Sequence, residues 1–294
     1  MGSADIIPGV SGGTIAFITG IYEQLLGSIK SVDLEAFKLL LSGQFKSFWS
    51  KINGPFLLVL FSGILVSLFS LARLIGYLLA HHPIQLWAFF FGLILISALV
   101  VSKDITQWTL MVILFFVVGI VSAYFITKAV PTETSDGYLF IFLAGAIAIC
   151  AMILPGISGS FILLILGKYS FILNAVKEFN ITVIVIFALG CVTGLLTFSR
   201  AVSWLLNRYR NVTIALLAGF MIGSLNKVWP WKETIETYTD RHGEIKPLIE
   251  ENILPATFEA QGGDPHLIGA ILFFIVGMAL VFIIERTAMS KTSK

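Results

Sequence analysis

The feature that most constrains this chain is a series of apolar runs that carry almost no charge. One run, residues 84–102, contains no Asp, Glu, Lys or Arg. A helix of roughly 20 apolar residues is needed to cross a hydrocarbon core of about 30 Å. Backbone groups in that core must be hydrogen-bonded internally, which restricts spanning segments to helices and closed barrels. Because these runs are continuously apolar rather than alternating, they predict helices.

Composition supports a membrane protein with many spans. Hydrophobic residues make up 57% of the 294 residues and charged residues only 12%, whereas a soluble domain carries about 25% charged residues. We therefore predict an all-α polytopic membrane protein. Six full spans are expected, of which the fifth is short: 55–80, 84–102, 108–127, 181–207, 212–225 and 267–284.

Two further apolar stretches are broken in the same way. The first motif, DIIPGVSGGTIAFITGIYE at 5–23, returns in the second half of the chain as the second motif, MILPGISGSFILLILGKYS at 152–170. Proline and clustered glycine leave backbone groups without helical partners, which lipid tolerates only where protein covers them or a polar cavity adjoins them. One such motif is compatible with a packed kink. Two copies favour re-entrant hairpins.

The repeat extends beyond the motifs. When the spans that follow them are aligned in one constant register, Gly63 matches Gly190 and Arg73 matches Arg200. Each half is then a hairpin followed by three spans, and an odd number of spans makes the halves inverted repeats, as in secondary transporters. We expect halves at 1–137 and 138–294, the second including an extramembrane loop at 226–266. Only four residues precede the first motif, so the symmetry predicts that the half-helix before it is missing and that this chain begins inside its first hairpin. The sequence leaves open whether the natural protein starts upstream of Met1.

Positive charge predicts the orientation. Lysines and arginines gather before the first full span, at Arg208 and Arg210 between the fourth and fifth spans, and at the C-terminus, and cytoplasmic segments carry such an excess. Both termini are therefore expected in the cytoplasm and the loop 226–266 outside, where its charged part should contribute little to transport.

The helix that follows each break is a candidate anion site. Its first N–H groups and its positive dipole end favour negative charge, and small residues let a ligand approach the backbone. The candidates are Ser11, Gly12, Gly13 and Thr14 in the first half and Ser158, Gly159 and Ser160 in the second. The alternative is close helix packing through small residues.

Four charged residues within the apolar stretches are further candidates. Arg73 and Arg200 would cost several kcal/mol there unless paired, and a guanidinium binds phosphate bidentately; snorkelling to the interface is the alternative. Asp5 and Glu23 flank the first motif and have no acidic counterparts in the second. Each is a candidate for proton coupling or for pairing with an arginine. No metal or cofactor is expected, because the four histidines show no ligand spacing.

The doubled motif, ADIIPGVSGGTIAFITGIYE with ILPGISGSFILLILGKY, resembles the bacterial polyprenyl-phosphate transporter family. The resemblance implies a non-enzymatic flippase of the bacterial inner membrane. Its substrate would be undecaprenyl phosphate, moved from the outer to the inner leaflet for recycling of the cell-wall lipid carrier, with proton coupling left open. The implied partners are this lipid phosphate and membrane lipids, with a homodimer as a candidate assembly and no nucleic acid.

Two other classes of protein share parts of this pattern. Undecaprenyl-pyrophosphate phosphatases carry PG-x-S-R-S-G and a paired-glutamate motif. Here glycine stands where that arginine would be, and the spans lack the glutamates, so hydrolysis is disfavoured. An inorganic-anion transporter would use the same helix-end chemistry, and a substrate assay is needed to separate it from a lipid transporter.

Overall fold

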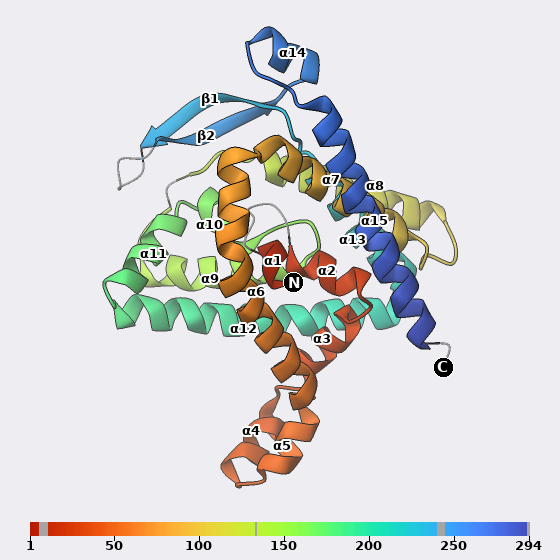
Figure 1. Ribbon diagram of the computed structural model, residues 1–294. Coiled ribbons are helices and arrows are strands. Elements are labelled where there is room, and N and C mark those ends of the chain that lie inside the picture. The colour runs from red at the N-terminus through yellow and green to blue at the C-terminus, as the bar shows by residue number, and fades with distance from the viewer. Residues whose placement is uncertain (6–10, 133, 240–244, 293–294) are drawn as a thin grey trace.

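The structure is a computed structural model that describes residues 1–5, 11–132, 134–239 and 245–292, and most of these are helical (Figure 1). Five described helices are long and apolar enough to cross a membrane: α6 (Gly54–His81), α7 (Pro83–Ser102), α8 (Leu110–Lys128), α12 (Ile181–Arg208) and α15 (Leu267–Thr292). The chain is therefore a multi-pass α-helical membrane protein, as its apolar runs predict.

The predicted fifth span is the short helix α13 (Arg210–Ser224), with 15 residues. At 1.5 Å per residue it is about 22 Å long, which is less than the hydrocarbon thickness of about 30 Å. Most of its side chains are buried, including Ile214, Ala218 and Met221. Helix α13 is therefore mostly covered by the rest of the protein, which accounts for its apolar sequence although it is too short to cross the hydrocarbon core alone.

The break predicted in the first motif falls on residues 6–10, which lie outside the described residues, whereas the second motif is described throughout and interrupts a helix after Ile153. The first runs from α1 (Gly2–Asp5) to α2 (Gly12–Ile18) and α3 (Tyr22–Lys30), and the second from α9 (Tyr138–Ile153) to α10 (Gly159–Ile165) and α11 (Tyr169–Lys177). Helices α10 and α11 are bent by 108° relative to each other. Gly20 and Gly167 have positive φ between the short helices, a conformation that glycine adopts without strain.

The element bounds repeat along the chain. Helices α10 and α11 begin and end at the positions that match the bounds of α2 and α3 when the two motifs are aligned. In the register that aligns Gly63 with Gly190, α12 begins and ends with α6, and α13 begins with α7. The same local sequence thus gives the same local structure in both halves. That the halves are inverted relative to each other stays a prediction.

Three helix pairs form most of the packed interior: α8 with α13, α7 with α15, and α9 with α12. The pairs approach closely through small residues, as is usual in membrane proteins. A Cβ atom at Gly219 of α13 would overlap the Phe116 carbonyl oxygen of α8, so only glycine fits there. Helix α6 differs from these pairs, because only Gly54 and Ile75 are buried along its length.

Two non-spanning parts lie at opposite ends of the molecule in Figure 1. At one end are α4 (Leu34–Leu41) and α5 (Phe45–Lys51), where Lys51 pairs with Asp33 at 2.9 Å. At the other end are the strands β1 (Lys232–Thr239) and β2 (Ile245–Asn252), an antiparallel hairpin, followed by α14 (Pro255–Ala260). The indole N–H of Trp231 donates to the Pro265 carbonyl at 3.0 Å and ties this end to the start of α15.

Candidate functional site

The first tip, residues 11–14, begins α2 with a serine cap. Ser11 has extended backbone angles, and its hydroxyl accepts a hydrogen bond from the Gly13 N–H at 3.0 Å. Serine is a preferred N-cap because its oxygen satisfies one of the first N–H groups of a helix. Ser11, Gly12, Gly13 and Thr14 are all buried.

The first tip joins the second motif in the interior of the protein. The Ser11 hydroxyl lies within donating distance of the Met152 and Leu154 carbonyl oxygens, at 3.1 and 3.0 Å. In the other direction, the Gly156 N–H donates to Thr14 Oγ1 at 3.1 Å. We call these contacts the tip joint. Ser11 and Thr14 are 0% exposed, so the joint is shielded from both solvent and lipid.

The second tip, residues 158–160, repeats the cap. The Ser158 hydroxyl accepts from the Phe161 N–H at 3.2 Å and lies 3.2 Å from the Ser160 hydroxyl. Gly156 precedes it with φ of +94°, and a Cβ atom there would lie 2.8 Å from Ser224 Oγ. Both the backbone conformation and the packing against α13 therefore require glycine at this position.

A carboxylate already occupies the start of α2. Asp5 Oδ1 accepts from the Gly12 N–H at 2.7 Å, and Asp5 Oδ2 is buried without a hydrogen-bond partner among the described residues. An anion at this place is favoured by the helix dipole and the first N–H groups. Asp5 thus holds the position that the sequence suggested for a ligand anion. Glu23 instead pairs with Arg210 at 2.7 Å, with both side chains about half exposed (55% and 51%).

The two predicted arginines lie away from the tip joint. Arg73 is exposed on α6. Arg200 donates from Nη2 to the Val32 carbonyl oxygen at 3.1 Å and from Nη1 to the Leu196 carbonyl oxygen at 3.3 Å. Within the described part of the chain, neither guanidinium shares a hydrogen bond with the tips. Ser11 and Thr14 therefore contact the second motif, whereas neither Arg73 nor Arg200 belongs to the tip joint.

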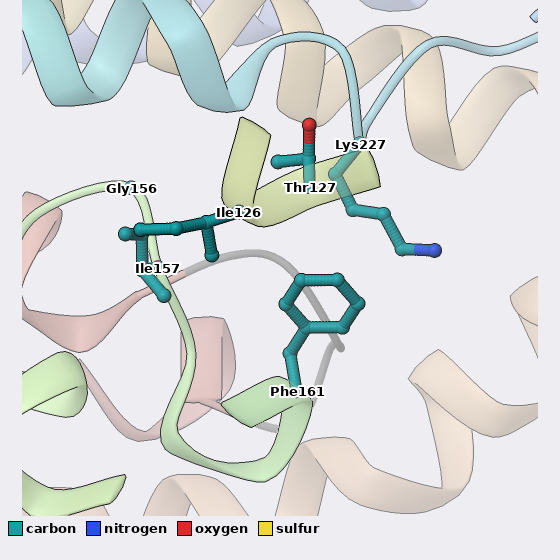
Figure 2. A pocket seen from close by; sticks show the side chains of 6 residues that line it. All are labelled: Ile126, Thr127, Gly156, Ile157, Phe161 and Lys227. Carbon is teal, nitrogen blue, oxygen red and sulfur yellow. The ribbon is translucent and has the colours of Figure 1, made fainter. Parts of the chain in front are cut away.

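One lysine that the sequence analysis did not single out, Lys227, lies near the second tip, and another, Lys168, lies beyond the far end of α10. Lys227 Nζ sits 5.0 Å from the ring centre of Phe161, which belongs to α10. Figure 2 shows Lys227 beside the hollow that Gly156, Ile157 and Phe161 line. Lys168, inside the second motif, is buried and pairs with Asp136. The only sequence signal for Lys227 was its position directly after a short apolar span.

No group of three or more His, Cys, Asp or Glu side chains in the described ranges could hold a metal ion. The groups near the tips are hydroxyls, backbone N–H groups, one carboxylate and nearby lysines. The hydroxyls, N–H groups and ammonium groups of this set can donate hydrogen bonds to an anion, and the carboxylate competes with the anion for these donors.

Fold and site together define a multi-pass membrane protein in whose interior the start of α2 is hydrogen-bonded to the second motif. Helices that begin inside the protein are typical of secondary transporters. A family model described as undecaprenyl phosphate translocase-like matches residues 1–246, and the chain belongs to this family. The resemblance noted from the doubled motif is thereby confirmed.

Two relatives are similar over most of their length, and both are named polyprenyl-phosphate transporter. The protein from Vibrio cholerae is 47% identical over 289 residues, which cover 98% of this chain and 94% of the relative. The protein from Staphylococcus aureus is 35% identical over 249 residues, which cover 78% of this chain and 83% of the relative. No solved structure matches the chain.

Proposed function

We propose that the chain transports undecaprenyl phosphate from the outer to the inner leaflet of the bacterial cytoplasmic membrane. The family and the names of the two relatives support a polyprenyl phosphate as the substrate. The observation that carries the route is the tip joint, where polar groups of both motifs meet in the interior of the protein.

The proposed substrate has a charged phosphate headgroup, which requires a polar environment, and an apolar tail, which is stable in lipid. Its phosphate monoester carries about 1.5 to 2 negative charges near pH 7, and an isolated charge in a medium of low dielectric costs many kcal/mol. Its polyisoprenyl tail is as apolar as the lipid. The protein therefore has to supply a polar path for the headgroup alone, while the tail stays in the bilayer.

The two tips would form the cradle of that path. In the present state the hydroxyls of the first tip, Ser11 and Thr14, are bonded to the second motif in the tip joint. Binding of a headgroup would exchange these bonds for bonds to phosphate oxygens. If the halves are inverted repeats, rocking one against the other would open the cradle to each leaflet in turn.

Asp5 is suited to couple this exchange to protons. Phosphate and the Asp5 carboxylate compete for the Gly12 N–H, and two like charges cannot share it. Protonation of Asp5 removes its charge and weakens its hold on Gly12. In this hypothesis, protonation and headgroup binding favour each other. An Asp5→Asn variant that still responds to an imposed pH gradient as the wild type does would contradict it.

The arginines would act as relays before and after the cradle. Removing a charge-assisted contact to phosphate costs about 1.5–3 kcal/mol, or roughly a tenfold to hundredfold loss of binding. Arg73→Ala and Arg200→Ala are therefore each expected to slow translocation, and lysine should restore it only partly because it lacks the planar fork. Arg200 also donates a hydrogen bond to the Val32 carbonyl oxygen. The melting temperature of the Arg200→Ala variant must therefore be measured together with its transport rate. Normal transport by both alanine variants would make the arginines structural.

The test of the function is translocation by the purified full chain in proteoliposomes. Undecaprenyl phosphate is placed in the outer leaflet, and its disappearance is followed with a membrane-impermeant phosphate-reactive probe. We expect protein-dependent loss of accessible lipid and no release of inorganic phosphate from undecaprenyl pyrophosphate. Phosphate release would favour a phosphatase. Competition by millimolar inorganic phosphate, with direct uptake of that ion, would favour an inorganic-anion transporter.

A further inference from the structure

A cluster of two lysines and one glutamate lies beside the second tip, at the end of the molecule that carries the β-hairpin. Lys227 follows α13, Lys232 begins β1, and Glu250 belongs to β2. The Nζ atoms of both lysines lie 3.5 Å from the same oxygen, Glu250 Oε2. We call these three residues the lysine cluster. Two cations share one carboxylate, so the cluster keeps a net positive charge.

The lysine cluster contacts the helical part of the protein as well as its own loop. Lys232 Nζ donates to the Lys227 carbonyl oxygen at 2.9 Å and lies 4.5 Å from the ring centre of Trp87 on α7. The Lys232 side chain is only 10% exposed. A lysine is seldom so enclosed unless its charge is matched, and one shared carboxylate at 3.5 Å is a weak match. The site therefore has the capacity to bind further negative charge.

A cavity of about 230 Å³ opens next to the cluster. Phe161, Leu164 and Val130 give it apolar walls, and Lys227 and Glu250 lie at its polar side together with Lys128 and Glu251. Two lysines and two glutamates thus face this space, and Lys232, which donates to the Lys227 carbonyl oxygen, is not part of its lining. The apolar wall formed by Val130, Phe161 and Leu164 beside Lys227 suits the first carbons of an amphiphile with a small anionic head, which a free ion lacks.

The cluster also connects to the tip joint. Lys227 lines a second hollow with Gly156, Ile157 and Phe161, and Gly156 makes the hydrogen bond to Thr14 (Figure 2). This hollow is too narrow for a water molecule. The lysine cluster is thus next to the proposed cradle but closed off from it in this state.

We propose that the lysine cluster is a loading site for a phosphate monoester, in which Glu250 stands in for the phosphate until the ligand arrives. The proposal rests on the transport function above and adds the place where the headgroup is first bound on the β-hairpin side. A phosphate group carries more charge than a carboxylate and offers three oxygens, so it can contact both lysines at once. The first isoprene units would then lie against Phe161 and Leu164.

This assignment gives the extramembrane hairpin a direct part in transport. The sequence analysis predicted that its charged stretch contributes little to transport. Lys232 and Glu250 instead belong to the strands of that hairpin and face the membrane-embedded part of the protein. Removal of the hairpin would take away one cation and the competing carboxylate together.

Binding in nanodiscs tests the proposal with variants whose effects have opposite signs. Lys227→Met and Lys232→Met keep the side-chain length and remove one charge, and each should weaken undecaprenyl phosphate binding tenfold or more. Glu250→Gln removes the competitor and should tighten binding severalfold. Lys46→Met removes a lysine from α5 at the opposite end of the molecule, so it is the matched control and should bind like the wild type.

The readout separates the possible ligands and the two proposals. Binding is followed by the rise in melting temperature with undecaprenyl phosphate, with inorganic phosphate as a second arm. Protection by inorganic phosphate that depends on the same lysines would support the site and make the free anion its ligand. Weaker binding after Glu250→Gln, or unchanged binding in both lysine variants, would overturn the loading site. If the loading site is overturned in this way, translocation by the wild type would still support the transport function. If instead the lysine-dependent binding is found but the wild type does not translocate the lipid, the transport function would be contradicted and the loading site supported.

Discussion

At the scale of single residues, Gly13 decides how closely the two motifs can approach. A Cβ atom at Gly13 would overlap the Ile153 carbonyl oxygen at the end of α9. Backbone cannot rotate away as a side chain can, so a methyl group there has to push the tip joint apart. Overpacking of this kind costs about 1–3 kcal/mol.

Gly13→Ala is therefore expected to lower the melting temperature and to slow undecaprenyl phosphate translocation. Gly27→Ala is the matched control, because Gly27 lies in α3 with no atom within 4 Å of its would-be Cβ. That change should leave stability equal or slightly higher, since alanine favours a helix by up to about 1 kcal/mol over glycine. Equal melting temperatures for the two variants would show that the tips have room to separate.

The charge of Lys232 predicts a pH dependence of binding. Burial lowers the pKa of Lys232 to about 8 from its ordinary value of 10.5, against the opposing effect of Glu250. Lys227 and Glu250 are the charged groups that face it, with the Trp87 ring on the α7 side. Below about pH 8 the ammonium is charged, and its burial costs stability. As the pH rises from about 8 to 10.5, Lys232 loses its proton in the folded protein before it does so in the unfolded chain, so the folded state gains stability. Over the same range the lysine cluster loses one positive charge.

We expect undecaprenyl phosphate affinity in nanodiscs to fall as the pH rises above about 8. The lipid phosphate itself has a second pKa near 6, so its charge is nearly constant over this range. Lys232→Arg keeps its charge at all these pH values and should show a flat profile between pH 7.5 and 9.5. A decline of the same size in the arginine variant would place the titrating group elsewhere.

Local sequence predicted the residues of the tips but not their partners. Serine after a Pro-Gly break is a standard helix cap, and both motifs show it at Ser11 and Ser158. The bonds from Ser11 to the Met152 and Leu154 carbonyls join residues from opposite halves of the chain. No spacing rule reaches that far.

At the scale of helices, apolar length was a sufficient guide to the spans. Five long runs became helices within a few residues of the predicted bounds, because backbone groups in lipid have to be satisfied within each segment. Packing was not predictable in the same way. Equivalent helices α6 and α12 have different surroundings, since α9 covers α12 while α6 is mostly exposed.

This difference predicts opposite responses at equivalent positions of the repeat. A Cβ atom at Gly190 of α12 would overlap the Phe142 carbonyl oxygen of α9, whereas one at Gly63 of α6 meets nothing within 4 Å. Gly190→Ala should destabilise the protein by about 1–3 kcal/mol. Gly63→Ala should be neutral or stabilising by up to about 1 kcal/mol. Melting temperatures of the two variants in the same nanodiscs measure the difference.

A comparable loss of stability at both positions would mean that another helix covers α6 in the membrane. The comparison needs no assumption about transport, because both substitutions add one methyl group to a helix interior. It therefore tests the packing of the two halves separately from their function.

At the scale of the whole molecule, the proposed direction of transport depends on which ends face which side. The β-hairpin and the α4–α5 segment lie at opposite ends in Figure 1, so a single orientation should place one outside and the other in the cytoplasm. The excess of lysine and arginine in the short segments predicts that α4–α5 is cytoplasmic. The lysine cluster, which contains residues of the β-hairpin, would then meet its phosphate at the outer leaflet.

Single cysteines test this orientation in a chain whose native Cys150 and Cys191 are replaced by alanine. Thr237 in β1 and Ser47 in α5 are both exposed, so a cysteine at either place should react without disturbing the fold. A membrane-impermeant maleimide should label Thr237→Cys in intact cells and Ser47→Cys only after permeabilisation. The reverse pattern would place the lysine cluster in the cytoplasm and make it an unloading site at the inner leaflet. Labelling of both cysteines in intact cells would mean that the two ends do not lie on opposite sides of the membrane.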